Sequence, residues 1–450
     1  MTGHRIAALL PFVTATVLKV ASALAALLFS IAIARLMPLE DASRFFFVHS
    51  AATVLSVLLI LGMDMLLLRG TAALHQTEAN ADILDLRHST FVASTLVSAL
   101  LVPLSFAGLL LWGEAILGSA WSAGFFFAIS APFLAYIAQT AEALRGLGRY
   151  NAQTLLYGIA VPTAAIVLLA AHRLQVDRTS VLAGAAAFLL SSILVSGFAA
   201  TLWSKARRQL YTLGSPERFR PELLRGSVSF FFLSGAQTIQ QFVPVIIVGL
   251  FKSGPDLGFY YASFRIAMLV SFVLTASNVI IAPMLSRVHA RSDHGAMKNL
   301  VRLSSAIGGL TATPIALVFF FRGDVFLGLF GEAYAEALPI LRVLLIGQLV
   351  NAFSGAILFF LLMSNKERTV AWINVLSLVT SIIGGYLLIG AYGSMGAAIT
   401  STVTTSAVNL AAVTAVFVSS KFLVFPWVSS NILSALSYPQ QPSRTDALTK

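Results

Sequence analysis

The chain has 450 residues, of which 58% are hydrophobic and only 10% are charged, with a mean hydropathy of +0.88. Because a soluble domain carries about 25% charged residues, this composition excludes a soluble protein and indicates a polytopic membrane protein. There is no cysteine, which excludes disulfides, thiol catalysis and cysteine-ligated metals. The formal net charge of +11 fits basic loops that orient a membrane protein better than nucleic-acid binding.

The first apolar run extends from Ile6 to about Leu36 and contains one lysine, Lys19, near its middle. At about 1.5 Å per residue, such a helix crosses a hydrocarbon core of ~30 Å, and it is too long for a signal peptide. A charge at that depth costs ~2.5–3.5 kcal/mol. We therefore expect Lys19 to face a wet cavity built by the other helices; the alternative is a lysine that snorkels to the membrane surface.

Apolar segments of similar length recur along the chain and predict twelve transmembrane helices. Their expected bounds are 7–34, 45–68, 89–112, 121–143, 153–171, 180–203, 227–251, 260–285, 301–321, 336–363, 370–391 and 395–419. The sequence therefore predicts an all-α membrane protein with about 12 transmembrane helices in two six-helix lobes around a central cavity.

The basic residues are distributed unequally between the two sets of loops. With a cytoplasmic N-terminus, cytoplasmic segments hold 20 of them and periplasmic segments hold six, namely Arg35, Arg44, Arg173, Arg178, Lys252 and Arg322. Three remain inside helices. Because basic residues favour the cytoplasmic side, this bias predicts that both termini are cytoplasmic.

The longest loop, Ser204–Arg225, is basic and contains two prolines, and it follows the sixth predicted helix. We expect residues 1–203 to form an N-terminal lobe, 204–225 a cytoplasmic linker and 226–420 a C-terminal lobe. Residues 421–450 form a cytoplasmic tail whose polar end is expected to be disordered.

Two stretches about 215 residues apart look alike: ARLMPLEDASRFFF (34–47) and GLFKSGPDLGFYYA (249–262). Each is an apolar helix end, a turn with proline and aspartate, and an aromatic triplet. Six helices per half make both halves enter the membrane from the same side. The halves are therefore expected to be parallel repeats, related by a pseudo-twofold axis along the membrane normal.

The residues that can carry function are charges inside the predicted helices. Lys19 is the deepest, while Arg265 and Arg342 lie about two turns into their helices, where each either faces the cavity or snorkels. Asp64 and Arg69 lie together at the end of the second predicted helix. They form either part of a substrate site or only an ion pair at the membrane interface. Glu142 and Arg145 have the spacing of an ion pair on one helix.

Motifs of other chemistries are missing. There is no Gly-rich phosphate loop ending in Lys-Ser/Thr, no Ser-x-x-Lys or Gly-x-Ser-x-Gly nucleophile, and no zinc-like set of histidines. The sequence gives no support for an enzyme, a metal site or an organic cofactor.

Several motifs resemble the O-antigen and exopolysaccharide flippases of the multidrug/oligosaccharidyl-lipid/polysaccharide exporter superfamily. They are GMDMLLLRGTA (62–72), LRGLGRYN (144–151), residues 254–290, residues 329–368 and GSMGAAITSTVTTS (393–406). The resemblance implies alternating access by two lobes in the bacterial inner membrane. It also implies that undecaprenyl-pyrophosphate-linked oligosaccharide is moved to the periplasmic leaflet, for surface polysaccharide (O-antigen or exopolysaccharide) biosynthesis.

The resemblance implies further partners, namely membrane lipids, a polysaccharide polymerase and a chain-length regulator. Coupling to the membrane potential, a proton or sodium is open. The related lipid II flippases place essential cations on the first and eighth helices, where Lys19 and Arg265 fall here. The predicted substrate-binding residues are Lys19, Arg265, Arg342, Asp64 and Arg69.

Three other functions compete with this interpretation, one of them a non-transporting assembly scaffold. A multidrug antiporter of cations needs buried carboxylates, and only Asp64 and Glu142 qualify. A membrane polysaccharide polymerase or ligase needs a sizeable periplasmic loop, and the loops predicted for that side are short.

Overall fold

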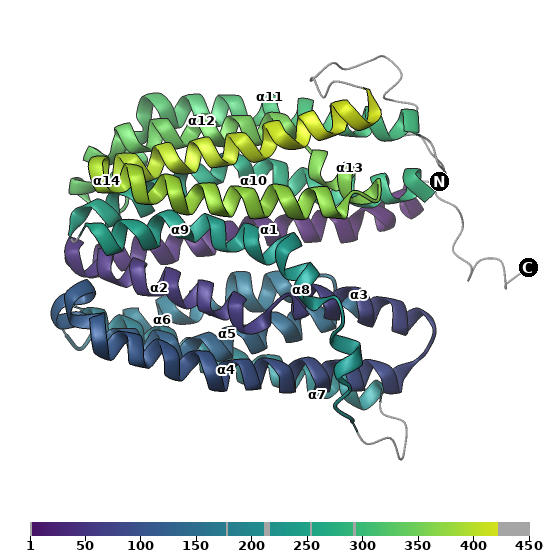
Figure 1. Ribbon diagram of the computed structural model, residues 1–450, viewed down its shortest axis with the longest axis horizontal. Helices are drawn as coiled ribbons and strands as arrows, with labels where there is room; N and C mark the ends of the chain where they lie inside the picture. Colours follow the sequence, from purple (N-terminus) through teal and green to yellow (C-terminus); the bar gives the residue numbers. More distant parts are fainter. Residues whose placement is uncertain (1, 177–178, 211–216, 253, 291–293, 422–450) are drawn as a thin grey trace, which may run out of the picture.

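The computed structural model describes residues 2–176, 179–210, 217–252, 254–290 and 294–421, in which every regular element is a helix. Their order along the chain is shown in Figure 1. The helices are α1 (Thr2–Leu36), α2 (Leu39–Ile60), α3 (Met63–Gln76), α4 (Asn80–Leu117), η1 (Gly118–Ala120), α5 (Ala123–Gly146), η2 (Thr154–Ala160), α6 (Val161–Arg173), α7 (Val181–Leu210), η3 (Pro221–Leu224), α8 (Ser227–Phe230), η4 (Phe231–Gly235), α9 (Ala236–Phe251), α10 (Pro255–Ala290), α11 (His294–Gly328), η5 (Glu332–Ala337), α12 (Leu338–Ser354), α13 (Ile357–Met363) and α14 (Glu367–Ser420).

Ten helical segments of the described chain are long and apolar enough to cross a membrane. One of these ten is α14, where the two helices expected at 370–391 and 395–419 form one element that changes direction at Gly393, which has φ 55°. The 36-residue α10 lies outside the ten, although it contains the expected helix 260–285. The chain is therefore an all-helical, multi-pass membrane protein.

The expected helix bounds differ most from the structure around the second span. The segment 45–68, expected to be one helix, is broken between α2 and α3 because Leu61 and Gly62 both have a left-handed backbone, with φ 46° and φ 78°. Because neither residue can continue a right-handed helix, α3 takes a new direction. Later in the chain, α7 runs to Leu210, into the segment expected to be the linker.

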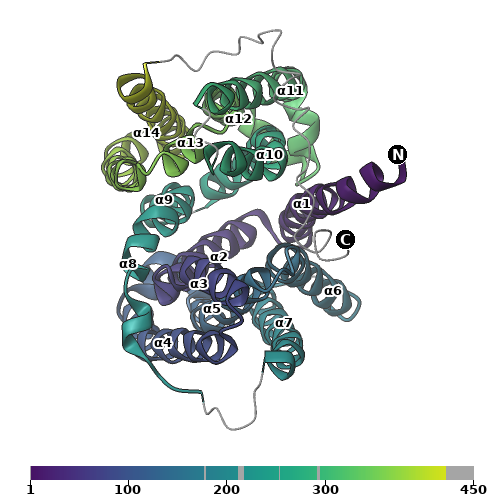
Figure 2. The same cartoon turned by 90° about the vertical axis from the view of Figure 1, so that its right-hand side faces the viewer.

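The helices form two bundles (Figures 1 and 2). In the N-terminal bundle, α2, α3, α4 and α7 pack around α5. In the C-terminal bundle, α10, α11, α12 and α14 pack together, with α9 against α14. The first helix contacts both bundles, because it packs against α10 as well as against η2 and α6. The surface between the two bundles is called the seam. The end of the molecule at which α1 begins is called the basic end, and the other end is called the opposite end.

The two similar sequence stretches meet at the seam. The Ser43 hydroxyl accepts a hydrogen bond of 3.1 Å from the Gly258 amide, 215 residues away in the chain. Phe46 and Tyr261, which have the same separation, stack with ring centroids 4.0 Å apart. Equivalent positions of two parallel repeats meet each other at a twofold axis. The contacts are therefore those expected of a pseudo-twofold axis that passes between α2 and α10.

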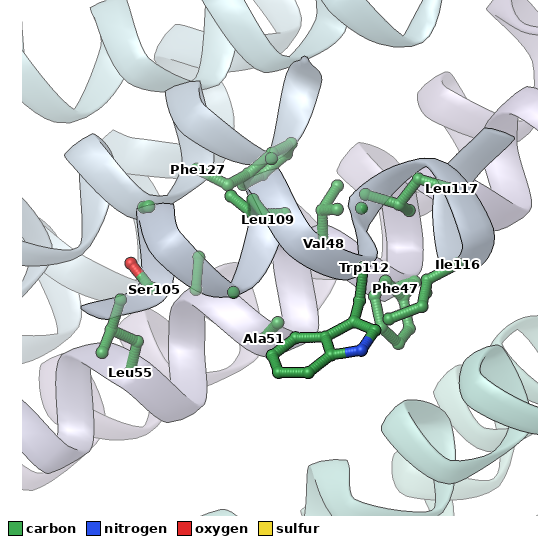
Figure 3. A pocket seen from close by; sticks show the side chains of 15 residues that line it. Phe47, Val48, Ala51, Leu55, Ser105, Leu109, Trp112, Ile116, Leu117 and Phe127 are labelled. Atoms are coloured by element: carbon green, nitrogen blue, oxygen red, sulfur yellow. The ribbon is translucent and has the colours of Figure 1, made fainter. Parts of the chain in front are cut away.

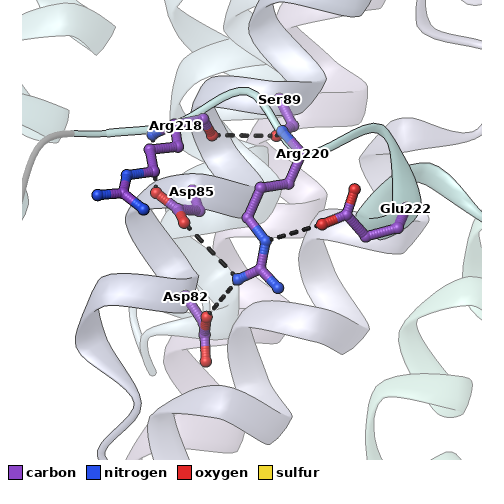
Figure 4. A network of polar contacts seen from close by, with 6 residues as sticks. All are labelled: Asp82, Asp85, Ser89, Arg218, Arg220 and Glu222. Carbon is purple, nitrogen blue, oxygen red and sulfur yellow. Dashed lines mark hydrogen bonds and ion pairs between the residues drawn. The ribbon is translucent and has the colours of Figure 1, made fainter.

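Part of the segment between the bundles is fixed to the N-terminal bundle (Figure 4). The backbone amides of Arg218 and Arg220 donate to Asp85 Oδ1 and Ser89 Oγ of α4, each at 2.8 Å. The Arg220 guanidinium bridges Asp82 at 2.9 Å and Glu222 at 3.0 Å. This anchor holds the segment up to η3, so a change in the angle between the bundles has to occur after it.

We predict that Asp85→Ala loosens this anchor. The substitution removes the acceptor of the Arg218 amide, so hydrogen exchange in peptides covering residues 217–224 should become several-fold faster. Asp82→Ala is the matched control, because it removes only a side-chain contact of Arg220 and leaves both amide hydrogen bonds in place. Equal exchange in the two variants would contradict the anchor.

Candidate functional site

Lys19 lies on α1 and points to the N-terminal bundle. Its Nζ donates a hydrogen bond of 3.2 Å to Oε1 of Gln153, the residue that precedes η2, and its side chain is half-buried. It also lies within electrostatic range of Glu142 and Arg145 on α5. A lysine that snorkels would instead extend its amine to the membrane surface. The structure therefore places Lys19 toward polar partners inside the protein.

Arg265 lies on α10, across the seam from α2. Its guanidinium donates to the Tyr261 hydroxyl and stands 4.9 Å from the centre of the Tyr261 ring, one turn earlier. It lies within electrostatic range of His49 on α2 and of Tyr157 on η2. The buried Nε of Arg265 has no hydrogen-bond partner in the described part of the chain. The charge of Arg265 therefore faces the N-terminal bundle and keeps an unused donor.

The two cations converge on one short segment. Lys19 bonds Gln153, and Arg265 lies within electrostatic range of Tyr157, one turn further along the chain. Residues Thr154–Ala160 form a π-helix, a conformation that is common at functional sites. Gly158 lets α1 approach closely, since a Cβ there would lie 2.1 Å from Ser22 Oγ. This segment therefore keeps α1, the helix that carries Lys19, next to the seam. Arg265 faces the same seam from α10.

One carboxylate, that of Glu142, lies within electrostatic range of Lys19. Glu142 forms an ion pair of 3.2 Å with Arg145, which confirms the pair expected from their spacing. Asp64, at the start of α3, is within electrostatic range of Glu142. The seam therefore gathers three cations, Lys19, Arg145 and Arg265, against two carboxylates.

The other two candidate residues lie away from this group. Asp64 and Arg69 were predicted either as a substrate site or only as an interfacial pair, but Arg69 forms an ion pair of 3.2 Å with Glu367 of α14, because α3 turns Arg69 toward the C-terminal bundle. Arg342 lies within the C-terminal bundle, where its Nε donates to the Phe320 carbonyl at 3.0 Å and its guanidinium covers the Phe320 ring at 5.1 Å. The structure thus groups Lys19, Arg265 and Asp64, whereas Arg69 lies at the basic end of the seam and Arg342 lies in the C-terminal bundle.

The bundles are also joined at both ends of the seam. At the opposite end, Arg35 of α1 donates to the carbonyls of Leu329 at 2.8 Å and Gly328 at 2.6 Å, at the C-terminal end of α11. At the basic end, the bridge is the Arg69–Glu367 ion pair. Any rocking of the bundles has to break one of these connections.

The sequence did not indicate four residues of the site, namely Gln153, Tyr157, Tyr261 and His49. Each is neutral and has a simple alternative role in packing, so no local signal separates it from the other polar residues of the helices. Tyr261 is the exception, because it belongs to the repeated aromatic triplet. The repeat is therefore the one signal that pointed to this part of the seam.

A surface pocket of about 380 Å³ lies between α2, α4 and α5 (Figure 3). Its walls are almost entirely apolar and include Phe47, Leu109 and Trp112, with Ser105 as the one hydroxyl. It lacks charged side chains, so it suits a hydrocarbon chain rather than a polar solute.

Residues 156–339, from η2 to the start of α12, match a family model described as "Polysaccharide biosynthesis protein". The chain is similar to a structure of the lipid II flippase MurJ in an inward closed conformation, with a TM-score of 0.70 and 14% identity over 95% of this chain and 94% of that one. An inward-facing multidrug resistance MATE family transporter of the MOP superfamily gives a TM-score of 0.64 and 14% identity over 94% and 99%. The chain has the fold of the MOP superfamily.

A MOP superfamily transporter from Pyrococcus furiosus, reported with a reversed polarity of its binding pocket, gives a TM-score of 0.63 and 14% identity over 95% of this chain and 96% of that one. No curated protein sequence matches the chain. The expected resemblance is confirmed as a match to the polysaccharide biosynthesis family over residues 156–339 and as a MOP-superfamily fold over nearly the whole chain.

Proposed function

We propose that this MOP-fold protein is a flippase for undecaprenyl-pyrophosphate-linked oligosaccharide in surface polysaccharide biosynthesis. The observation that carries the proposal is the convergence of Lys19 and Arg265, from different bundles, on residues 153–160 at the seam. Both cations face protein rather than lipid. The family match over residues 156–339 and the likeness to MurJ support a lipid-linked precursor as the cargo.

The chemistry of the cargo explains why cations are needed at this place. A pyrophosphate cannot cross ~30 Å of hydrocarbon without replacement of its hydration shell. Positive side chains supply charge-assisted hydrogen bonds, and Arg265 has a buried donor still unused in this structure. A membrane potential that is negative inside adds about 2.3 kcal/mol per charge per 100 mV in favour of outward movement.

We further propose that the bundles act as two six-helix lobes of residues 1–203 and 226–420, which rock about the seam. In this arrangement the basic end is cytoplasmic, so both termini lie in the cytoplasm of a bacterial cell and the protein spans its inner membrane twelve times. The pyrophosphate would rest between the lobes while the connection at one end of the seam opens and the other stays closed.

The test is a transport assay in proteoliposomes that contain the full-length protein and a fluorescent undecaprenyl-pyrophosphate oligosaccharide. We expect the probe in the inner leaflet to reach the outer leaflet only when the protein is present, and to move faster with an inside-negative potential. In cells, deletion should remove one surface glycan and leave its lipid-linked precursor on the inner leaflet. Export of a cationic dye without movement of the lipid would instead identify a multidrug transporter.

A further inference from the structure

A second pocket, with a volume of about 520 Å³, lies between η4 and the start of α14 near the basic end. Its apolar walls come from Phe230, Phe232 and Leu233 on one side and from Ala371, Trp372 and Val375 on the other. Figure 2 shows that α8, which leads into η4, and α14 lie on the face of the molecule away from α6. A lipid in the surrounding membrane can therefore enter this pocket from the side.

One edge of this pocket is charged. Glu367 and Arg368 line it together with Ser229, and Trp372, which is 66% exposed, follows Arg368 by one turn. Among the described residues no carboxylate bridges Arg368. The pocket thus combines an apolar interior with a charged rim, and its Arg368 can pair with the anionic head group at the end of a hydrocarbon chain.

The rim also contains the connection between the bundles at the basic end. Arg69 of α3 pairs with Glu367 at 3.2 Å, and its guanidinium lies 5.0 Å from the centre of the Phe230 ring, so it contacts both walls of the pocket. Arg69 and Glu367 are both about half-exposed, with side-chain exposures of 45% and 52%. An anion that reaches the rim therefore meets Arg69, Arg368 and a competing carboxylate.

We propose that this pocket is the lateral docking site for the lipid carrier of the substrate, a polyisoprenyl chain with its first phosphate. This inference rests on the proposed function and names where the lipid end of that cargo is held. The isoprenoid chain packs between Phe232, Leu233 and Ala371, and the phosphate binds Arg368 and Arg69.

The geometry couples docking to movement. A phosphate bound at the rim takes Glu367's place on Arg69, because one guanidinium cannot pair fully with both anions. The loss of the Arg69–Glu367 bridge frees the basic end of the seam, so the bundles can part only after the carrier lipid has docked. Glu367 thus acts as an internal competitor for the substrate.

The experiment measures the binding of radiolabelled undecaprenyl phosphate to the full-length protein in nanodiscs. Ala371→Trp fills the pocket and should weaken binding roughly tenfold, since an overfilled site has no room for the chain. Leu376→Trp is the matched control, because Leu376 is on the same helix and 61% exposed but does not line the pocket. Equal weakening in both variants, or none in either, would overturn the proposal.

The charged rim gives a test of opposite signs. Arg69→Gln and Arg368→Gln should each weaken binding roughly tenfold, because each removes a charge-assisted hydrogen bond. Glu367→Gln should tighten binding, because it removes the competing carboxylate. If the Arg69–Glu367 pair were only structural, Arg69→Gln and Glu367→Gln would change binding in the same direction, and that result would overturn the proposal.

Two competition arms identify the lipid. Uncharged undecaprenol should bind more weakly than undecaprenyl phosphate, and phosphatidylglycerol in excess should fail to displace the phosphate lipid. Displacement by phosphatidylglycerol would mean that the pocket holds ordinary membrane lipid. These experiments measure binding and are therefore separate from transport. If the variants change lipid binding as expected but the protein does not flip the lipid, the proposed function alone is rejected. If the protein flips the lipid but Ala371→Trp binds it as tightly as the unchanged protein, the docking site alone is rejected.

Discussion

Replacing Lys19 or Arg265 by glutamine is expected to stop glycan export while the amount of protein in the membrane stays unchanged. Each variant removes a cation that faces the seam, from α1 and α10 respectively. A hydrogen bond to a charged group is worth about 1.5–3 kcal/mol, so each substitution should weaken pyrophosphate binding roughly tenfold or more. The double variant should show no export, measured as surface glycan by immunoblot.

The control for this experiment is Arg342→Gln. Arg342 is also a cation in a membrane helix, but it is held by the Phe320 carbonyl inside the C-terminal bundle. Its replacement changes the net charge by the same amount without touching the seam. Lys19→Arg should restore part of the export, because it keeps the positive charge. Full export in the Lys19 and Arg265 double variant would reject the role of both residues.

Gly62→Ala is expected to force the two bundles apart at the basic end. A Cβ on Gly62 would lie 2.2 Å from the Ser227 carbonyl oxygen and 2.4 Å from the Phe231 amide nitrogen, both in the C-terminal bundle. Backbone atoms cannot move aside as a flexible side chain does, so the α3–α8 contact has to open. Overpacking costs about 1–3 kcal/mol, and the left-handed backbone of Gly62 adds about 1–2 kcal/mol for alanine.

The measurement uses the lack of cysteine in the chain. Spin labels at Glu78→Cys and Asn365→Cys, both exposed, report the distance between the bundles at the basic end. Gly62→Ala should lengthen this distance and lower the melting temperature. Gly226→Ala is the matched control, because Gly226 has φ 92° but no atom within 4 Å of its added Cβ. An unchanged distance in Gly62→Ala would show that the bundles do not depend on this contact.

Much of the fold could be predicted because its signals are local. Long apolar runs indicated membrane helices, and the turn expected between 391 and 395 is the change of direction at Gly393. The repeat spacing anticipated the contacts of Ser43 with Gly258 and of Phe46 with Tyr261. The break at Gly62 was missed, because one glycine in an apolar run is as compatible with a continuous helix as with a turn.

The candidate site could be predicted only in part. The sequence showed which helices carry Lys19, Arg265 and Arg342, since a charge in an apolar run is visible without a structure. It did not show their directions, and it gave no sign that Arg87 is buried. The structure buries Arg87 of α4 against α5, where it donates to Thr140 Oγ1 at 2.8 Å and stands over the Tyr136 ring at 5.1 Å.

The sequence by itself determined that this is a helical membrane protein with cations inside its helices, and it predicted two similar halves. Only the tertiary structure decided that Lys19 meets Gln153, 134 residues away, and that Arg69 meets Glu367, 298 residues away. The physical reason is that a membrane helix is apolar on the face toward lipid and on the face toward its neighbours. Its hydropathy therefore fixes where the helix lies in the chain but not which way each charge points, and that direction is set by packing between distant segments.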